Sequence, residues 1–116
     1  MMNRAELLQK SCKHLEQAAS AEEISAALAA LPDWHVEHEK LTRSFSFKNF
    51  HQTIDFVNAI ASIIHQEDHH PELVASYNRC IVKFNTHSVN AGKGGLSEND
   101  FICAAKIDAV FQQAFC

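Results

Sequence analysis

Residues 50–71 read FHQTIDFVNAIASIIHQEDHHP, and this stretch decides the fold that we expect for the chain. Its apolar residues recur at intervals of three and four, which is the period of an amphipathic helix with one face in a core. The expected core stripe is Phe50, Ile54, Val57, Ala61 and Ile64. The helix must end near His69, because the residue before Pro71 is pushed out of the α region.

Apolar and polar residues alternate on both sides of this helix, which predicts strands. Before the helix, a short strand covers residues 34–36 and another covers 43–47, where two phenylalanines share one face. After the helix, residues 73–78 and 80–86 have the composition of two strands. The chain between these two is either a turn at Asn78-Arg79 or a bend in one continuous strand, and the pattern leaves both open.

Three further helices are predicted from their starts and their spacing. Ser20-Ala-Glu-Glu23 is a capping box, and the helix that it opens ends at Pro32. Ser97-Glu-Asn-Asp100 has the same form, with Asp in place of Glu or Gln, and opens the last helix. Residues 3–18 carry apolar side chains at helical spacing, which predicts a short amphipathic helix at the N-terminus.

The order of these elements is helix, helix, two strands, helix, two strands, helix. Short links between paired strands favour an α+β fold with a four-stranded antiparallel sheet and helices packed on one face. We expect residues 1–19 to form an N-terminal helical extension and residues 20–116 to form the domain. The length of 116 residues and the hydrophobic content of 47% suit one compact domain.

Charge and cysteine content exclude several functions. The formal net charge of −4 provides no electrostatic footprint for direct binding of nucleic acid. No stretch approaches the roughly 20 apolar residues of a membrane span, and we expect no signal peptide. No Cys-x-x-Cys pair occurs, so we expect reduced thiols in a cytoplasmic protein. The cysteines are Cys12, Cys80, Cys103 and Cys116.

Histidines and acids gather at the end of the long helix. His65 and His69 stand four residues apart, the spacing of a helical zinc pair, with His87 or Asp68 as a third ligand. However, Gln66 stands where His-Glu-x-x-His would have its glutamate, and a solvated helix end explains His65 as well. We therefore expect no metal, and keep a small metalloprotein as an alternative.

His69, His70 and Pro71 indicate a ligand site instead. A helix that ends at a proline turns two adjacent side chains in different directions, so they can contact different atoms of one ligand. The helix C-terminus also favours a protonated imidazole. His87 follows a strand and precedes a glycine-containing loop, a position typical of site residues, although surface histidines also occur there. Asp100 is equally well explained as a helix cap.

Taken together, these residues resemble the pterin-4a-carbinolamine dehydratase family. The family pattern is an acid, lysine or histidine, three residues, His-His-Pro, five residues, an aromatic, nine residues, His, and then Asp after a variable gap. This chain has, at those spacings, His65, His69-His70-Pro71, Tyr77, His87 and Asp100. The resemblance covers most of the chain, apart from the first nineteen residues.

Two departures from the family concern the pterin pocket that the resemblance implies. Leu73 stands where the family often has Trp, so one wall of the pocket would differ. Residues 88–95 form a longer segment than in the mammalian members, so the loop beside the site would differ too.

The resemblance implies dehydration of a 4a-hydroxy-tetrahydropterin, left by aromatic amino acid hydroxylases, to quinonoid dihydropterin and water during tetrahydrobiopterin recycling. The step needs a proton delivered to the C4a hydroxyl and a proton removed from a ring nitrogen. Imidazoles with a pKa near about 6.5 can do both, each worth roughly 10²- to 10⁴-fold. The reaction needs no cofactor, metal or covalent nucleophile.

The resemblance also implies roles for the individual side chains. We expect His69 and His87 to be the acid–base pair, and His70 to orient the pterin and to share in proton transfer for one stereoisomer. A carboxylate near an imidazole orients it and favours its protonated form. The residues expected to bind the substrate or to orient these groups are Asp68, Pro71 and Asp100.

The implied partners are the pterin substrate, an aromatic amino acid hydroxylase as metabolic partner, and further copies of the chain in a homodimer or homotetramer. Mammalian members double as a dimerisation cofactor for a homeodomain transcription factor. A protein-binding coactivator module, acting through the outward face of helix 50–68, is therefore the alternative function. The expected location is cytoplasmic, and also nuclear if the coactivator role holds.

Overall fold

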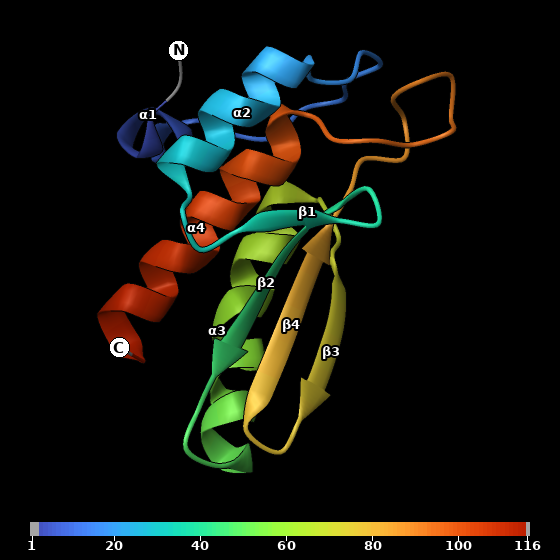
Figure 1. Ribbon diagram of the computed structural model, residues 1–116. Coiled ribbons are helices and arrows are strands. Elements are labelled where there is room, and N and C mark those ends of the chain that lie inside the picture. Colours follow the sequence, from blue (N-terminus) through green and yellow to red (C-terminus); the bar gives the residue numbers. More distant parts are fainter. Residues whose placement is uncertain (1–2, 116) are drawn as a thin grey trace.

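The computed structural model describes residues 3–115, and its centre is one antiparallel sheet of four strands. The strands are β1 (His35–Glu37), β2 (Lys40–Ser46), β3 (Glu72–Ser76) and β4 (Arg79–Phe84). Their order across the sheet is β1-β2-β4-β3, so β4 lies between β2 and β3 (Figure 1). Every neighbouring pair is antiparallel.

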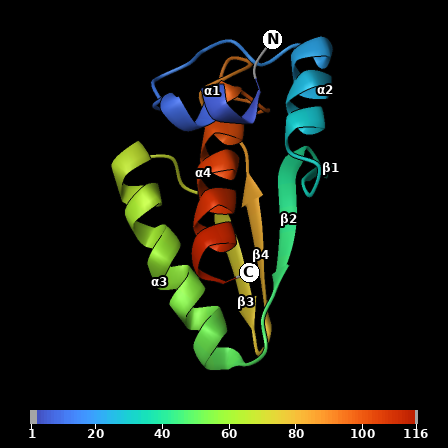
Figure 2. The ribbon, with the colours of Figure 1, turned by 90° about the vertical axis from the view of Figure 1, so that its left-hand side faces the viewer.

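The helices are α1 (Arg4–Gln9), α2 (Ala21–Ala30), α3 (Phe50–Glu67) and α4 (Glu98–Ala114). Helices α3 and α4 lie side by side on one face of the sheet, while α1 and α2 lie near the N-terminal end of α4 (Figure 2). This arrangement is the α+β fold with helices on one face that the sequence predicts. No helix within residues 3–115 is both long and apolar enough to cross a bilayer.

The core is built from aromatic side chains that the sheet and the two long helices share. Phe45 of β2 and Phe47, which directly follows this strand, are the two phenylalanines predicted to share one face, and both are buried. They pack against Phe56 of α3 at ring-centroid distances of 4.7 and 5.0 Å, and against Phe111 of α4 at 5.0 and 5.9 Å. Leu7 of α1 is also fully buried in this core.

The long helix α3 has the predicted extent, but the predicted core stripe is only partly right. Phe50 is 47% exposed, and the other four residues of that stripe are half-buried, of which Val57 and Ile64 pack against the core. The buried face carries instead Thr53, Phe56, Ile60 and Glu67. Both stripes have the helical period, and the sheet and α4 cover the one that contains the large Phe56 ring.

The N-terminal helix is also shorter than predicted, since α1 ends at Gln9 and not near residue 18. Beyond it, side chains from elsewhere bind the backbone that a helix would have used. The Cys12 N–H donates to Glu67 Oε1 at 2.8 Å, and the Lys13 N–H donates to Asn99 Oδ1 at 3.2 Å. Tertiary hydrogen bonds therefore replace the helical ones in this segment.

Strands β3 and β4 are separate and are joined by a turn, so they are not one continuous strand with a bend. The turn is at Tyr77 and Asn78, one residue earlier than predicted. Two hydrogen bonds hold the carbonyls of this turn. The Thr53 hydroxyl donates to the Tyr77 carbonyl at 3.1 Å, and the Phe47 N–H donates to the Asn78 carbonyl at 2.8 Å. The two strands therefore form a tight hairpin anchored on the start of α3.

A buried ion-pair network ties the helices to the sheet at Asp108 of α4. This carboxylate is almost fully buried and accepts from Trp34 Nε1 at 2.8 Å, Arg43 Nη1 at 2.7 Å and Arg4 Nη2 at 3.1 Å. Burial raises the pKa of Asp108 above its usual range, even though these donors favour the charged form. The network needs all its members, because an unpaired buried charge is costly.

Candidate active site

The end of α3 places the first histidine of the candidate site. Asp68 is the C-cap of this helix in the left-handed region, with φ of 51° and ψ of 42°, and the chain then turns toward Pro71 and β3. His69 follows this cap and is held against the sheet. Its ring lies parallel to Phe84 of β4, with a centroid distance of 5.6 Å and an angle of 5° between the planes.

The buried carboxylate of Asp100 binds this histidine. Asp100 Oδ1 lies 2.6 Å from His69 Nε2, and Asp100 itself is 0% exposed. Its other oxygen, Oδ2, accepts from the Ser97 N–H and from the Thr86 hydroxyl, both at 2.9 Å. The carboxylate therefore cannot rotate without losing several bonds. Asp100 caps α4 and holds His69 at the same time, so the two interpretations considered for it describe one arrangement.

This contact determines which nitrogen of His69 can react. Since Nε2 faces a carboxylate that only accepts, Nε2 carries a proton. The remaining ring nitrogen, Nδ1, is the one that can give or take a proton from a bound molecule. A carboxylate in this position orients the ring and fixes its tautomer, as second partners do for functional histidines elsewhere.

A cavity of about 540 Å³ lies beside this pair. That volume is within the range of small-molecule sites. Three chain segments and one helix residue form its walls: the end of α3, the residues that follow β4, the chain that follows α1, and Asn99. The lining residues are Cys12 to His14, Glu67 to His70, Asn85 to Ser88, and Asn99.

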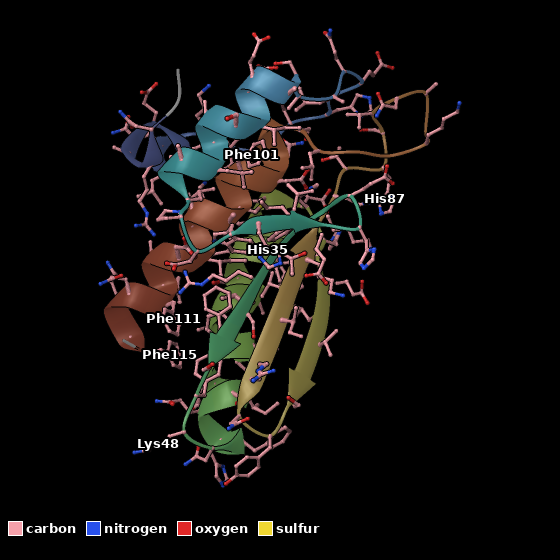
Figure 3. The ribbon with its side chains drawn as sticks, viewed as in Figure 1. His35, Lys48, His87, Phe101, Phe111 and Phe115 are labelled. Atoms are coloured by element: carbon pink, nitrogen blue, oxygen red, sulfur yellow. The ribbon has the colours of Figure 1, made fainter. Side chains whose placement is uncertain are left out.

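The structure brings together most of the site residues predicted from the sequence. His69, His70, His87 and Asp68 all line the cavity, and Asp100 holds His69 from within the fold. His87 is exposed, on the segment that leaves β4 (Figure 3). His70 is 67% exposed in its side chain, with Nε2 at 3.6 Å from Asp68 Oδ1. The site is therefore open to solvent on the side of His70 and His87.

Several residues of the sequence pattern lie outside the cavity lining. Pro71 shapes the chain after α3 but does not line the cavity. Tyr77 is 65% exposed at the β3–β4 turn, and Leu73, where the family often has Trp, packs against the core. His65 is exposed and does not line the cavity, so the three histidines considered as metal ligands are not assembled. Within residues 3–115, no group of three such side chains is arranged to hold a metal ion.

Other lining residues were not predicted. Thr86 bridges Asp100 and Ser97, with its hydroxyl 2.6 Å from the Ser97 hydroxyl, and Asn99 contacts the chain after α1. Thr86 directly precedes His87, and Asn99 lies inside the capping box of α4. Both residues are therefore sequence neighbours of residues that the pattern identifies. Nothing in the sequence indicates that Cys12, Lys13 and His14 would reach the site.

The fold and the cavity define a class: a small α+β protein with a carboxylate-held histidine and two further histidines around an open small-molecule site. Residues 17–110 match the family model described as pterin 4 alpha carbinolamine dehydratase. The chain therefore belongs to the pterin 4 alpha carbinolamine dehydratase family, a family of hydro-lyases.

Relatives over nearly the whole chain agree with this assignment. A protein of Bdellovibrio bacteriovorus named as a pterin-4-alpha-carbinolamine dehydratase is 57% identical over 115 residues, covering 99% of this chain and 96% of that protein. A protein of the same name from Nitrosospira multiformis is 49% identical over 110 residues, covering 92% of this chain and 94% of that one.

A solved structure has the same fold. The crystal structure of a transcriptional coactivator/pterin dehydratase from Brucella melitensis superposes with a TM-score of 0.73 at 35% sequence identity. The match covers 81% of this chain and 98% of that chain.

Proposed function

We propose that this chain converts a 4a-hydroxy-tetrahydropterin into quinonoid dihydropterin and water, as a step of tetrahydrobiopterin recycling. The observation that carries the proposal is the 2.6 Å contact between His69 and buried Asp100 beside a cavity that His70 and His87 also line. Family membership supports a pterin as the class of substrate. The residues to which we assign this chemistry, His69, His87 and Asp100, all lie within residues 20–116, the domain predicted from the sequence.

The reaction breaks the C4a–oxygen bond, and hydroxide is a poor leaving group. One imidazole delivers a proton to the C4a hydroxyl, which leaves as water, and another removes the proton of a ring nitrogen as the new double bond forms. His69 and His87 come from different segments and can therefore act on different atoms of one ligand. Each transfer contributes roughly 10²- to 10⁴-fold.

The remaining residues support this pair. His70, which points from the same helix end as His69, holds the pterin and shares in proton transfer for one stereoisomer. Asp100 keeps His69 in one tautomer, Asp68 lies beside His70, and Pro71 ends the helix so that the two histidines diverge. None of these steps uses a cofactor or a metal.

The metabolic partner in this proposal is an aromatic amino acid hydroxylase, which releases the substrate, and the location is the cytoplasm. We also propose a homo-oligomer, a dimer or a tetramer. The apolar residues at the start of α3 support it, because Phe50 is 47% exposed and Ile54 is half-buried. The same face would serve a protein-binding coactivator, which is the second candidate function.

The coactivator alternative has one specific observation in its favour: the similar Brucella melitensis protein is named both a transcriptional coactivator and a pterin dehydratase. Co-purification of the chain with a transcription-factor helix would support it. The dehydratase proposal is tested by stopped-flow measurement of dehydration of freshly made 4a-hydroxy-tetrahydropterin. We expect the protein to accelerate the decay well above the buffer rate, and a rate equal to buffer alone would overturn the proposal.

A further inference from the structure

Residues 10–19, which we call the strap, connect α1 to α2 and form one wall of the cavity. Figures 1 and 2 show this segment crossing the end of the molecule next to the loop that follows β4. Cys12, Lys13 and His14 of the strap line the cavity together with His69 and His87. These three residues lie outside residues 17–110, the part that matches the family model. The wall is therefore built by sequence that the family pattern does not describe.

The first anchor of the strap is Asn99, which is only 6% exposed. Its Oδ1 accepts from the Lys13 N–H at 3.2 Å, and its Nδ2 donates to the Lys13 carbonyl at 2.6 Å. A side-chain amide thus pairs with both backbone groups of one strap residue. The Lys13 side chain consequently starts from a fixed point on the cavity wall.

The second anchor is Glu67, whose side chain is 3% exposed. Oε1 accepts from the Cys12 N–H at 2.8 Å, and Oε2 lies 2.6 Å from Lys106 Nζ. Burial alone would raise the pKa of Glu67, but Lys106 and the Cys12 N–H together hold it below its usual range. Glu67 is two residues from His69, so this anchor connects the strap to the same helix end that places the histidine.

The strap is also held at its far end. The Ser88 hydroxyl donates to the Leu15 carbonyl, and the Ala19 N–H donates to the Leu96 carbonyl at 2.8 Å. Ser88 directly follows His87. The strap is therefore bonded on one side to the segment that carries His69 and on the other to the segment that carries His87.

Two exposed side chains of the strap, Lys13 and His14, have hydrogen-bond donors that no close protein group occupies. The Lys13 ammonium makes no hydrogen bond or ion pair with any residue in the described range 3–115. The His14 ring has only an exposed acid, Glu16, at 4.0 Å. A pterin carries a ring carbonyl and oxygen substituents, which are acceptors for such groups. On the same strap, Lys10 pairs with Glu98 at 3.3 Å and does not line the cavity.

We propose that the strap is a substrate-binding wall, on which Lys13 and His14 donate hydrogen bonds to oxygen atoms of the bound pterin. The inference rests on the proposed function and deepens it. These two residues bind the part of the substrate that does not react, whereas His69 and His87 act at C4a. Losing them therefore weakens substrate binding and leaves the proton transfers in place.

The test compares the double variant Lys13→Ala/His14→Ala with the control Lys10→Ala. All three side chains are exposed or half-exposed on one segment, so each protein should fold. We expect the double variant to raise KM for the 4a-hydroxy-tetrahydropterin by about threefold to tenfold, the effect of one or two lost hydrogen bonds, with kcat within about twofold. The control should keep both constants.

Equilibrium binding of a stable dihydropterin, measured by fluorescence, provides a second readout, and Kd should rise by the same factor. KM and Kd equal to those of the control would overturn the inference, and so would a loss confined to kcat. If the wild-type protein neither dehydrates nor binds the pterin, the proposed function fails instead, so the two failures are distinguishable.

Discussion

Replacing Asp100 by Asn tests how the site holds its histidine. Three donors converge on this carboxylate: His69 Nε2–H at 2.6 Å, and the Ser97 N–H and the Thr86 hydroxyl at 2.9 Å each. Asn has nearly the same shape, but one of its two terminal atoms is an NH₂ group that donates. In the variant, the NH₂ group must therefore face either the His69 Nε2–H or the Ser97 N–H, and both of these are also donors.

Either orientation of the new amide has a measurable cost. If the NH₂ faces His69, the ring must change its tautomer, and Nδ1 no longer has the protonation state set by Asp100. If it faces Ser97, the Ser97 N–H loses its acceptor and one half of the α4 capping box is lost, while the Ser97 hydroxyl still accepts from the Asn99 N–H. A buried donor left unpaired costs about 1–3 kcal/mol. We expect kcat to fall at least about tenfold, with KM changed less, and the free energy of unfolding to fall by about 1–3 kcal/mol.

The assay is stopped-flow dehydration across a pH series, together with urea unfolding. A merely structural role for Asp100 would leave the shape of the pH profile of kcat unchanged, whereas loss of the tautomer lock alters it. Glu98→Gln is the matched control, because it makes the same chemical change two residues earlier, at a side chain that pairs with Lys10 and not with a histidine. Wild-type kcat and an unchanged pH profile in the Asp100→Asn variant would refute this reasoning.

Three further predictions concern stability and thiol reactivity. Asp108→Ala leaves the Trp34 and Arg43 donors without their buried acceptor and should lower the free energy of unfolding, measured by urea unfolding, by about 3–5 kcal/mol. A loss below about 1 kcal/mol would show that this network contributes little to stability. Because the pKa of Glu67 is lowered in the folded state, its stabilisation is complete above the unfolded value of about 4.3 and is lost as the pH falls through the lower folded value. Urea unfolding at pH 6 and pH 3 should therefore show a smaller pH effect in Glu67→Gln than in wild type, and equal effects would exclude this contribution. Burial raises the pKa of Cys80 to about 11, so this thiol should resist an aromatic disulfide reagent at pH 8 until urea unfolds the chain; rapid labelling of native protein at Cys80, located by mass spectrometry, would be the contrary result.

Secondary structure was largely predictable because its signals are local. Pro71 ends α3 where expected, and the capping boxes at Ser20 and Ser97 open α2 and α4. The buried face of α3 was not predictable from period alone. Two adjacent stripes of this helix contain large apolar residues, and only the neighbouring sheet and α4 determine that Phe56 faces inward and Phe50 outward.

The N-terminal segment shows a second limit of local signals. Apolar spacing continues past Gln9, yet the backbone at Cys12 and Lys13 binds side chains that are 55 and 86 residues away in sequence. Such hydrogen bonds form only in the folded protein, so neither helix propensity nor local apolar spacing predicts them. Of the four cysteines, the three within the described residues are free thiols, and Cys116 lies outside the described residues.

The candidate site was predictable only in part, for the same reason. No single histidine stood out from surface histidines by its own context. The joint spacing of His69, His70, His87 and Asp100 pointed to one family, and the structure places all four at one cavity or directly behind it. The strap wall, in contrast, comes from residues whose apolar spacing predicts a helix, and it forms only when the chain is folded.

The central claim is that His69 and His87 carry out the proton transfers of dehydration. The most direct test is single-turnover stopped-flow dehydration of 4a-hydroxy-tetrahydropterin by wild type, His69→Ala and His87→Ala, with His65→Ala as control and circular dichroism to check the fold. Both site variants should lose at least about tenfold in rate while the exposed His65 variant keeps the wild-type rate, because a missing general acid or base typically costs more than that. Wild-type rates in both site variants would contradict the claim.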